Sequence, residues 1–527
     1  MYRMGIVLRN VKKLYYGISL ILLSWISIAH AEEAQFNVFE YRIEGATLLP
    51  VVDIEKAVYE YLGEKKTIAD VEKAREALER AYHDAGYLTA LVTIPQQKVD
   101  NDVVRLTVTE APVNRLRVVG SRYYSLGEIK ARVPELAEGN VPYFPEMQKQ
   151  LSALNRSADR KIAPVLRPGR TPGTVEVDLK VDDRLPLHGG IELNDRYSVD
   201  TTRTRLRANL RWDNLWQKQH GIGITVQTAP EKPEESKVFS LNYTWPLESG
   251  NYLAFYAVHS TSDVAAVGTL NVVGNGNIFG ARYIKPLPGD DDFFHSATFG
   301  VDYKDFDQTV VLLGGGDFNT PIRYMPFIAS WDGTWLGKGR TTKADLTLNF
   351  HLRDVIGDEE DFANKRFKGR SNYAYLRGNV SHTETWQQGW GMHIRASAQI
   401  TSQPLISNEQ LAIGGTETVR GYLESTALGD VGATAGLEAF TPNYAKVLSD
   451  SITDLHFLAF IEGGQVRVRQ PLPGQDDRFT LAGAGVGVRI KGWQGALAEL
   501  DWARALKNAG TVRAGDNRVH FRLGYEW

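Results

Sequence analysis

The sequence predicts a transmembrane antiparallel β-barrel of about sixteen strands, preceded by two small α/β modules with the element order β-α-α-β-β. Three observations support this fold class. Glycine (49 residues) and aromatic residues (10%) are plentiful, yet the mean hydropathy is negative, which does not indicate a helical membrane protein. Outside the N-terminus, no apolar run approaches the roughly 18 residues that a membrane-spanning helix needs. Beyond Arg184, helical periodicity gives way to alternating segments of strand length.

Residues 1–31 have the pattern of a secretory signal peptide. An apolar core over 14–28 follows four basic residues, and Ala29-His30-Ala31 fits a small-x-small cleavage site. An N-terminal membrane anchor is the alternative, but the apolar stretch is short for it. Removal of this segment would change the formal net charge from −3 to −7. A mildly acidic mature chain is not suited to binding nucleic acid.

The chain contains no cysteine. This composition excludes a lipoprotein anchor and thiolate metal sites, and the fold must be stable without disulfides. A closed barrel meets that requirement, because its stability comes from an unbroken ring of backbone hydrogen bonds.

Residues 32–110 predict the first module. Thr67 can cap a helix whose third residue, Asp70, reaches back to it, and Gly86 supplies the left-handed residue that ends a helix. The expected strand, two helices and two closing strands cover 36–43, 49–62, 67–86, 87–99 and 103–110.

Residues 111–183 repeat this order as a second module. Pro145 suits the first turn of a helix, where its missing N–H costs nothing. The expected elements cover 115–119, 125–133, 145–155, 160–166 and 174–181. We interpret the two stretches as an internal repeat of roughly 75 residues. A single α+β domain is the alternative.

Residues 184–527 predict the barrel. Segments of roughly ten residues suit strands tilted across a bilayer, and bacterial barrels have even strand numbers. Sixteen such segments start near His188, Arg203, His220, Lys237, Asn251, Gly268, Phe293, Pro321, Thr341, Arg370, Gly389, Asp430, Asp454, Phe479, Gly495 and Asn517.

The last segment gives the clearest strand signal. Phe521, Leu523, Tyr525 and Trp527 alternate with polar residues, so one face is wholly apolar. In a soluble sheet this would be an ordinary half-buried strand. In a lipid bilayer, the strand must pair with the first strand to avoid an open edge, and we therefore expect it to close the barrel.

Catalytic patterns are absent from the sequence. It has no Walker loop, no His-Glu-x-x-His, no Gly-x-Ser-x-Gly and no histidines at metal-ligand spacing. The glycine-rich run at 274–277 precedes no helix, so we interpret it as turn or strand. We therefore expect no enzymatic activity, no cofactor and no metal. An outer-membrane hydrolase is the alternative, because such barrels assemble their sites from residues scattered over several strands.

One loop is unlike the others. The connection over about 403–429 contains Gly414, Gly415, Val419, Arg420, Gly421 and Tyr422. Its glycines permit close backbone approach, and an arginine between apolar residues suits insertion into a polar lumen. A structured surface hairpin with a solvated arginine is the alternative.

These residues resemble a known motif. Val419-Arg420-Gly421-Tyr422, preceded by Ile413-Gly414-Gly415, is similar to the lumen-loop motif of the superfamily of outer-membrane assembly and secretion barrels. Four further segments resemble the two-partner secretion transporters, the haemolysin and haemagglutinin secretion/activation family; they are 87–89, 94–97, 164–169 and 185–198. The resemblance extends over essentially the whole chain after the signal peptide.

The resemblance implies a function. The two modules would be periplasmic polypeptide-transport-associated (POTRA) domains, and the barrel would lie in the outer membrane, surrounded by lipid and lipopolysaccharide after insertion by the barrel assembly machinery. The chain would act as a monomer that exports an unfolded secreted partner of β-helical type, captured by the POTRA domains, and possible activation of that partner stays open. An assembly insertase of the same superfamily is the alternative. A passive porin has no use for two such modules.

The resemblance also assigns a partner to Arg420. In the family, this arginine pairs with the aspartate of a Phe-x-Asp-x-Gly strand motif, and here Glu462 takes that position in 460–464. Parity supports the lumen side for Glu462, because it shares a face with Phe460, whereas the opposite face is apolar from Leu455 to Ile461. An unrelated lumen acid is the alternative.

Overall fold

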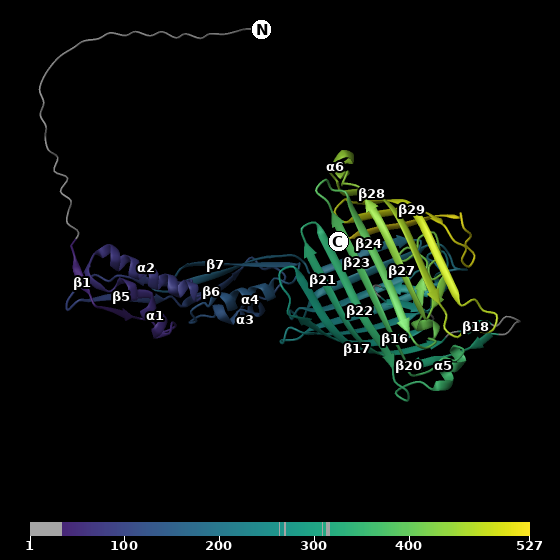
Figure 1. Ribbon diagram of the computed structural model, residues 1–527, viewed down its shortest axis with the longest axis horizontal. Helices are drawn as coiled ribbons and strands as arrows, with labels where there is room; N and C mark the ends of the chain where they lie inside the picture. Colours follow the sequence, from purple (N-terminus) through teal and green to yellow (C-terminus); the bar gives the residue numbers. More distant parts are fainter. Residues whose placement is uncertain (1–33, 263, 268–269, 274, 308, 312–316) are drawn as a thin grey trace, which may run out of the picture. The chain divides into compact units, whose positions relative to one another are not determined.

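The computed structural model describes residues 34–262, 264–267, 270–273, 275–307, 309–311 and 317–527. The expected signal peptide, residues 1–31, lies outside them. The chain divides into two compact units, one mainly from residues up to Val181 and the other mainly from Asp182–Trp527 (Figure 1). Within the part that the structure describes, no helix has both the length and the apolar character needed to cross a membrane.

The first module is a three-stranded sheet covered by helices. Its sheet order is β2-β5-β4, with β2 parallel and β4 antiparallel to β5. The expected first strand is divided in two, and a strand between the helices, β3, pairs with β1. The sequence did not indicate β3, because its four residues are mostly polar and do not alternate. The elements are β1 (Phe36–Val38), β2 (Glu40–Glu44), α1 (Val51–Val58), β3 (Gly63–Lys66), α2 (Ile68–Asp84), β4 (Ala90–Thr93) and β5 (Val103–Glu110).

The core of this module forms between α2 and the sheet. Ala74, Leu78 and Tyr82 of α2 are fully buried in one cluster with Leu106 of β5. Each large apolar side chain buried in this way contributes about 1.5–3 kcal/mol. The capping box expected at Thr67 and Asp70 is present, and Asp70 accepts a 3.1 Å hydrogen bond from the Thr67 backbone.

The second module has the same topology. Its sheet order is β6-β8-β7, with β6 parallel to β8. Pro145 lies in the first turn of its longer helix, as its missing N–H requires. The elements are β6 (Val113–Val119), α3 (Leu126–Ala131), α4 (Phe144–Leu154), β7 (Arg160–Pro168) and β8 (Val175–Asp183).

The second unit is a closed antiparallel barrel of sixteen strands, which confirms the predicted fold class. Its eighth strand is written as two pieces, β20 and β21, which both pair with β17 and are separated at Pro326. Proline lacks the N–H that a continuous ladder needs. The first eight strands are β9 (Leu187–Asn194), β10 (Arg205–Leu215), β11 (His220–Thr228), β12 (Lys237–Pro246), β13 (Tyr252–Ser260), β16 (Asn275–Leu287), β17 (Phe293–Asp307) and β20 (Ile322–Tyr324) with β21 (Phe327–Gly337).

The other eight strands continue the barrel to the C-terminus. They are β22 (Arg340–His351), β23 (Tyr373–Thr385), β24 (Gly391–Thr401), β27 (Val431–Phe440), β28 (Ile452–Arg467), β29 (Arg478–Gly492), β30 (Ala496–Ala505) and β31 (Asn517–Glu526). One expected start was wrong. The sixth strand begins at Asn275, whereas the expected start, Gly268, lies outside the described residues; β15 (Leu270–Val273), which follows it, pairs with β14 (Val264–Val267) in a separate two-stranded sheet.

The barrel closes between its first and last strands. Leu523 of β31 pairs with Leu193 of β9, and Tyr525 pairs with Ile191. The Trp527 backbone N donates a 3.0 Å hydrogen bond to the Gly189 carbonyl. A Cβ at position 189 would lie 2.2 Å from the Trp527 ring, so a larger residue there would displace this ring.

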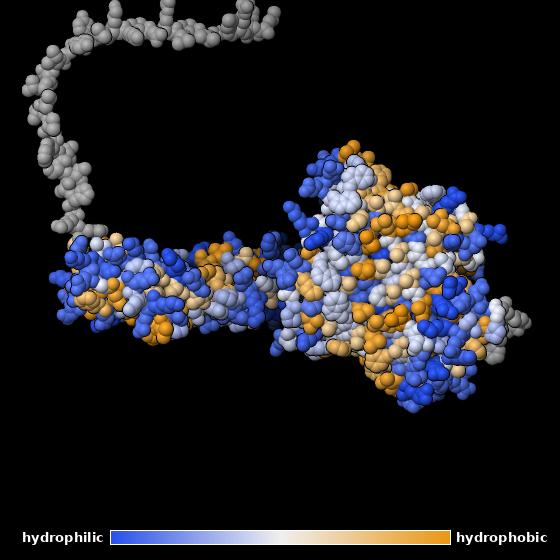
Figure 2. Space-filling model, in the orientation of Figure 1, coloured by the Kyte–Doolittle hydropathy of each residue, from blue (hydrophilic) through white to orange (hydrophobic). Residues whose placement is uncertain are grey.

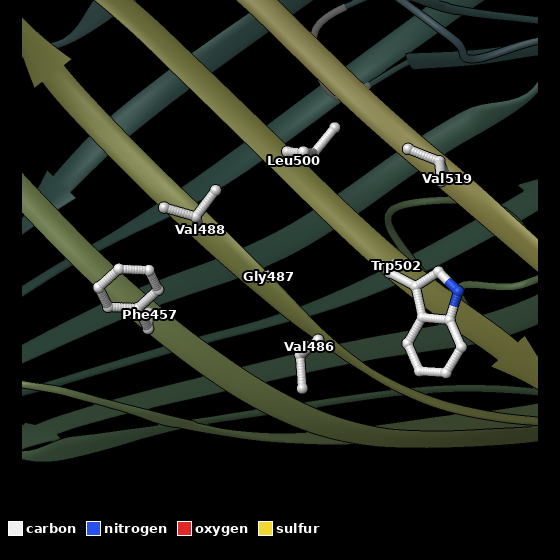
Figure 3. A pocket seen from close by; sticks show the side chains of 7 residues that line it. All are labelled: Phe457, Val486, Gly487, Val488, Leu500, Trp502 and Val519. Atoms are coloured by element: carbon white, nitrogen blue, oxygen red, sulfur yellow. The ribbon is translucent and has the colours of Figure 1, made fainter.

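The outer face of the barrel carries an apolar surface (Figure 2). Leu523, Tyr525 and Trp527 are all exposed, as lipid-facing side chains of an isolated barrel should be. Leu455 was expected on this face too, but it is buried because it packs with Ala445 of the short helix α6 (Ala445–Leu448). Farther along the same strands is an apolar groove lined by Phe457, Val486, Gly487, Val488, Leu500, Trp502 and Val519 (Figure 3).

Candidate functional site in the barrel lumen

The connection from β24 to β27 is folded inside the barrel. We call residues 402–430 the lumen loop; they contain a short hairpin of β25 (Leu411–Ile413) and β26 (Ala427–Gly429). Ile413, Val419 and Tyr422 are fully buried in one cluster with wall residues such as Leu481. Arg420 is only 2% exposed. A solvated arginine on a surface hairpin therefore does not describe this loop.

Arg420 lies among acidic side chains from three strands. Glu462 of β28 accepts hydrogen bonds from the Arg420 backbone N at 2.7 Å and from its Nε at 3.0 Å. Asp501 of β30 accepts from the guanidinium at 3.1 Å, and Glu438 of β27 is a third ion-pair partner. The guanidinium carbon also lies 3.4 Å from the ring centroid of Phe460, a cation–π contact. Every side of the guanidinium is thus occupied.

Two further arginines balance the charge of this cluster. Arg395 of β24 forms an ion pair with Glu462 and also contacts the Thr416 carbonyl of the lumen loop at 3.3 Å. Arg489 of β29 donates two hydrogen bonds to Asp501, at 2.7 and 2.8 Å. Three arginines therefore face three carboxylates. Such balance is necessary because an unpaired charge buried in a barrel is strongly destabilising.

Strand register explains how these groups meet. One row across the wall runs from Arg395 through Gly436, Glu462 and Gly483 to Ala505. Directly paired residues share a face of the sheet, so all of these positions face the lumen. The two residues beside Glu462 in this row are glycines, which leaves its carboxylate accessible to the loop. The longer side chain of glutamate, relative to aspartate, still reaches both the backbone and the guanidinium of Arg420.

Three alternate glycines of β29 make room for the loop. A Cβ at Gly483 would lie 2.1 Å from the Arg420 carbonyl oxygen. At Gly485 it would lie 2.6 Å from the Phe460 ring, and at Gly487 it would lie 1.9 Å from the Asp501 carboxylate. Contacts this short do not occur between real atoms, so larger residues would displace the loop or its partners. We call Gly483, Gly485 and Gly487 the glycine row.

The loop also contacts the seam where the barrel closes. The Gly421 backbone N donates to His520 Nε2 at 3.1 Å, and His520 Nδ1 lies 2.8 Å from an Asp195 carboxylate oxygen. Asp195 further accepts from the Phe521 backbone at 2.9 Å. These contacts fix the neutral His520 tautomer that carries its proton on Nδ1. The loop is therefore tied to the first and last strands.

The structure separates the residues singled out in the sequence into two groups. Those of the loop gather with Glu462 in the lumen, and the positive φ angles of Gly414 (105°), Gly415 (101°) and Gly421 (97°) suit glycine alone. The apolar residues of the last strand do not join this site, since they face outward: Phe521, Leu523, Tyr525 and Trp527.

The sequence did not indicate most of the charged cluster around Arg420. Glu438, Asp501, Arg395 and Arg489 were not singled out, nor was the glycine row. A signal existed for Asp501, because it is flanked by the outward-facing Leu500 and Trp502 and so has lumen parity. The repeated spacing of glycine at every second residue of β29 was a second signal.

Comparisons with known proteins agree with this architecture. The model of the POTRA domain, ShlB-type, matches residues 36–111, and the model of the haemolysin secretion/activation protein ShlB/FhaC/HecB matches residues 327–490. The heme/hemopexin transporter protein HuxB of Haemophilus influenzae is 20% identical over 74% of this chain and 69% of its own length. The outer membrane transporter CdiB of Dickeya dadantii is 21% identical over 89% and 82% of the two chains.

Solved structures share the fold. CdiB from Escherichia coli aligns with a TM-score of 0.62 at 16% identity, covering 95% of this chain and 92% of that one. BamA from Haemophilus ducreyi lacking POTRA domains 1–3 aligns with a TM-score of 0.57 at 13% identity, covering 93% and 100%. At such identities these likenesses concern the fold alone.

Fold and site together define an outer-membrane transport barrel with periplasmic POTRA modules and a loop fastened in its lumen. Residues 36–111 match the POTRA domain of ShlB type and residues 327–490 match the haemolysin secretion/activation protein ShlB/FhaC/HecB, and the chain is an outer-membrane two-partner secretion transporter. The predicted family, function and location are thus confirmed, and the family model favours secretion over the insertase alternative. Members of the family are transporters of secreted partner proteins.

Proposed function

We propose that this chain captures one unfolded partner of β-helical type with its POTRA modules and passes it through the barrel when the lumen loop leaves its place. The observation that carries the proposal is the fastening of the loop. Arg420 holds it to the wall by ion pairs and hydrogen bonds, which can break and re-form without loss of the barrel ladder. A loop held in this way suits a reversible gate.

Capture would use the edges of the two module sheets. In the order β2-β5-β4 and β6-β8-β7, the outer strands each have one side that pairs with no other strand of the described residues in the sheet. An extended chain can add to such an edge through main-chain hydrogen bonds, which do not depend on the identity of its side chains. This mode suits a partner that arrives unfolded. One relative is named a heme/hemopexin transporter, so a partner that binds these ligands is one candidate.

Direction would come from the partner itself. The periplasm lacks nucleoside triphosphates, so export has to run on binding and folding free energy. A partner that folds into extended β-structure at the cell surface cannot slide back through the lumen. In this proposal the chain works as a monomer without enzymatic activity, cofactor or metal, and the domains are 32–110, 111–183 and 184–527 after the signal peptide 1–31.

The Arg420→Ala variant tests the gate. We expect it to assemble as a barrel but to lose export, because a loop tip without its ion pairs no longer returns to one defined position. Wild type and the variant are each co-expressed with candidate β-helical exoproteins. The measurement is the amount of exported exoprotein in the medium. Arg467→Ala is the matched control, since Arg467 lies at the end of β28 with its side chain 61% exposed. Normal export by an assembled Arg420→Ala barrel would contradict the proposal.

A further inference from the structure

The lumen loop contacts the wall at a second place, before its hairpin. Leu405 and Ile406 are 1% and 2% exposed and belong to an apolar cluster with Phe306 of β17, Tyr324 of β20 and Tyr375 of β23. In the strand order of the barrel, these strands lie on a different arc from β27–β31, where Arg420 is held. The loop therefore bridges two arcs of the wall.

Glu409 is the charged residue of this second contact. It lies at the end of a single 3-10 turn (Ser407–Glu409) and is 2% exposed. Its Oε1 accepts hydrogen bonds from the Tyr324 hydroxyl at 2.6 Å and from Lys304 Nζ at 2.7 Å, and its Oε2 accepts from the Tyr375 hydroxyl at 2.8 Å. An ionised carboxylate only accepts hydrogen bonds, and here it has three donors from three strands.

The chain around Glu409 is fastened as well. Asp430, at the far end of the loop, accepts hydrogen bonds from the Leu405 backbone at 2.8 Å and from the Gln410 amide at 2.9 Å. It also accepts from the Arg469 backbone at 2.6 Å. Among the described residues, none of these groups belongs to the cluster around Arg420. The two fastenings can therefore break independently.

We propose that Glu409 is a second positioning residue of the loop, which holds its stem to β17, β20 and β23 while Arg420 holds its tip to β27, β28 and β30. The inference rests on the proposed function, in which the loop obstructs the path of the partner. Release of Arg420 alone leaves the stem in the lumen. The full width of the lumen opens only when Glu409 also separates from Lys304 and the two tyrosines.

Single-channel conductance of the full-length protein in planar bilayers tests this division. The set is wild type, Glu409→Gln, Arg420→Ala and the double variant. Glu409→Gln keeps the side-chain volume but removes the charge that Lys304 and two hydroxyls share. We expect the time spent in higher-conductance states to rise about tenfold, and the double variant to reach a larger conductance than either single variant. A double variant whose largest conductance equals that of Arg420→Ala would overturn the inference.

Control variants distinguish loss of the Glu409 contact from a folding defect. Glu417→Gln removes a carboxylate from the same loop, but that side chain is 68% exposed and forms a solvent-screened pair with Arg196, so the conductance should not change. Tyr375→Phe removes one hydroxyl and keeps the ring, and we expect a smaller rise in the same direction as for Glu409→Gln. Heat-modifiable migration in electrophoresis verifies that each barrel is closed.

Export by the same variants distinguishes the two hypotheses. If Arg420→Ala exports its partner normally while the Glu409 variants still change the conductance, the proposed gate is wrong and the second fastening stands. If Arg420→Ala blocks export but Glu409→Gln leaves the conductance at the wild-type value with or without Arg420→Ala, the gate stands and the second fastening is wrong.

Discussion

At the scale of single residues, the lumen site depends on small side chains as much as on charged ones. Arg420 can lie close against the lumen face of the wall only because Gly483, Gly485 and Gly487 have no side chains there. Its charge is tolerated only because Glu462, Glu438 and Asp501 surround it. The loop motif found in the sequence therefore supplies one side of this contact, and residues of the barrel wall supply the other side.

The Gly483→Ala variant tests this fit. A Cβ at this position would lie 2.1 Å from the Arg420 carbonyl, so the loop tip has to move away from β29. We expect conductance in planar bilayers to rise as in Arg420→Ala, although no charge has changed. Gly463→Ala on β28 is the matched control, because its Cβ would meet its nearest neighbour at an ordinary 3.7 Å. Equal conductance of the two variants would show that the glycine row does not position the loop.

A second prediction at this scale concerns Glu110 of the first module. Burial opposes ionisation of this carboxyl, but hydrogen bonds from Thr47, the Leu48 backbone and the Tyr82 hydroxyl outweigh it and lower its pKa. A group with a lowered pKa stabilises the folded state above its ordinary pKa, and this contribution is lost as the pH falls through the folded value. We therefore expect the contribution of Glu110 to stability to be present above its ordinary pKa of 4.5 and to be lost as the pH falls below that value.

Hydrogen exchange of the full-length protein measures this effect in the helix α2 and the strand β5. At neutral pH, Glu110→Gln should exchange faster than wild type, because the amide cannot accept all of these hydrogen bonds. The difference between the two proteins should shrink as the pH falls below the pKa of Glu110. Glu44→Gln, on the exposed end of β2, is the control that should exchange like wild type throughout. A difference that persists unchanged at low pH would exclude the ionised carboxylate as its cause.

At the scale of elements, the sequence predicted the barrel strands better than their partners. Period-two alternation fixes where a strand runs and which face is apolar, as for Phe521 to Trp527. It does not fix register, so it could not place Glu438, Asp501 and Arg395 at the same height as Arg420. The sixth strand was misplaced for a related reason, because Val264–Val267 and Leu270–Val273 are strands that pair with each other outside the barrel sheet.

Helices of the modules were predicted from local signals. The cap at Thr67 and the stop at Gly86 each depend on a few neighbouring residues, so the sequence alone sufficed for α2. The strand β3 was missed because its pairing with β1 is long-range and its composition is polar. The contacts of Glu409 with the barrel wall and of Gly421 with His520 at the seam were missed for the same reason, since only the closed barrel brings these groups together.

At the scale of the whole molecule, the barrel has an apolar outside and a charged inside that are built from the same strands. On β31, Leu523 faces outward and Arg522 faces the lumen, where it donates a 2.7 Å hydrogen bond to Glu192. One sheet can face lipid on the outside and the polar lumen on the inside, because successive side chains point to opposite faces. Stability in the membrane should therefore depend on which face a new charge enters.

The Leu523→Arg variant tests that dependence. An arginine at the bilayer midplane of a barrel costs about 2–4 kcal/mol, and less near the interface, because the guanidinium loses its hydration in hydrocarbon. We expect the midpoint of denaturant-induced unfolding in lipid vesicles to fall accordingly. Asn517→Arg, at the polar start of the same strand, should leave the midpoint within the error of wild type. If both variants unfolded alike, Leu523 would not face lipid, and the assignment of the outer face from parity and exposure would have to be revised.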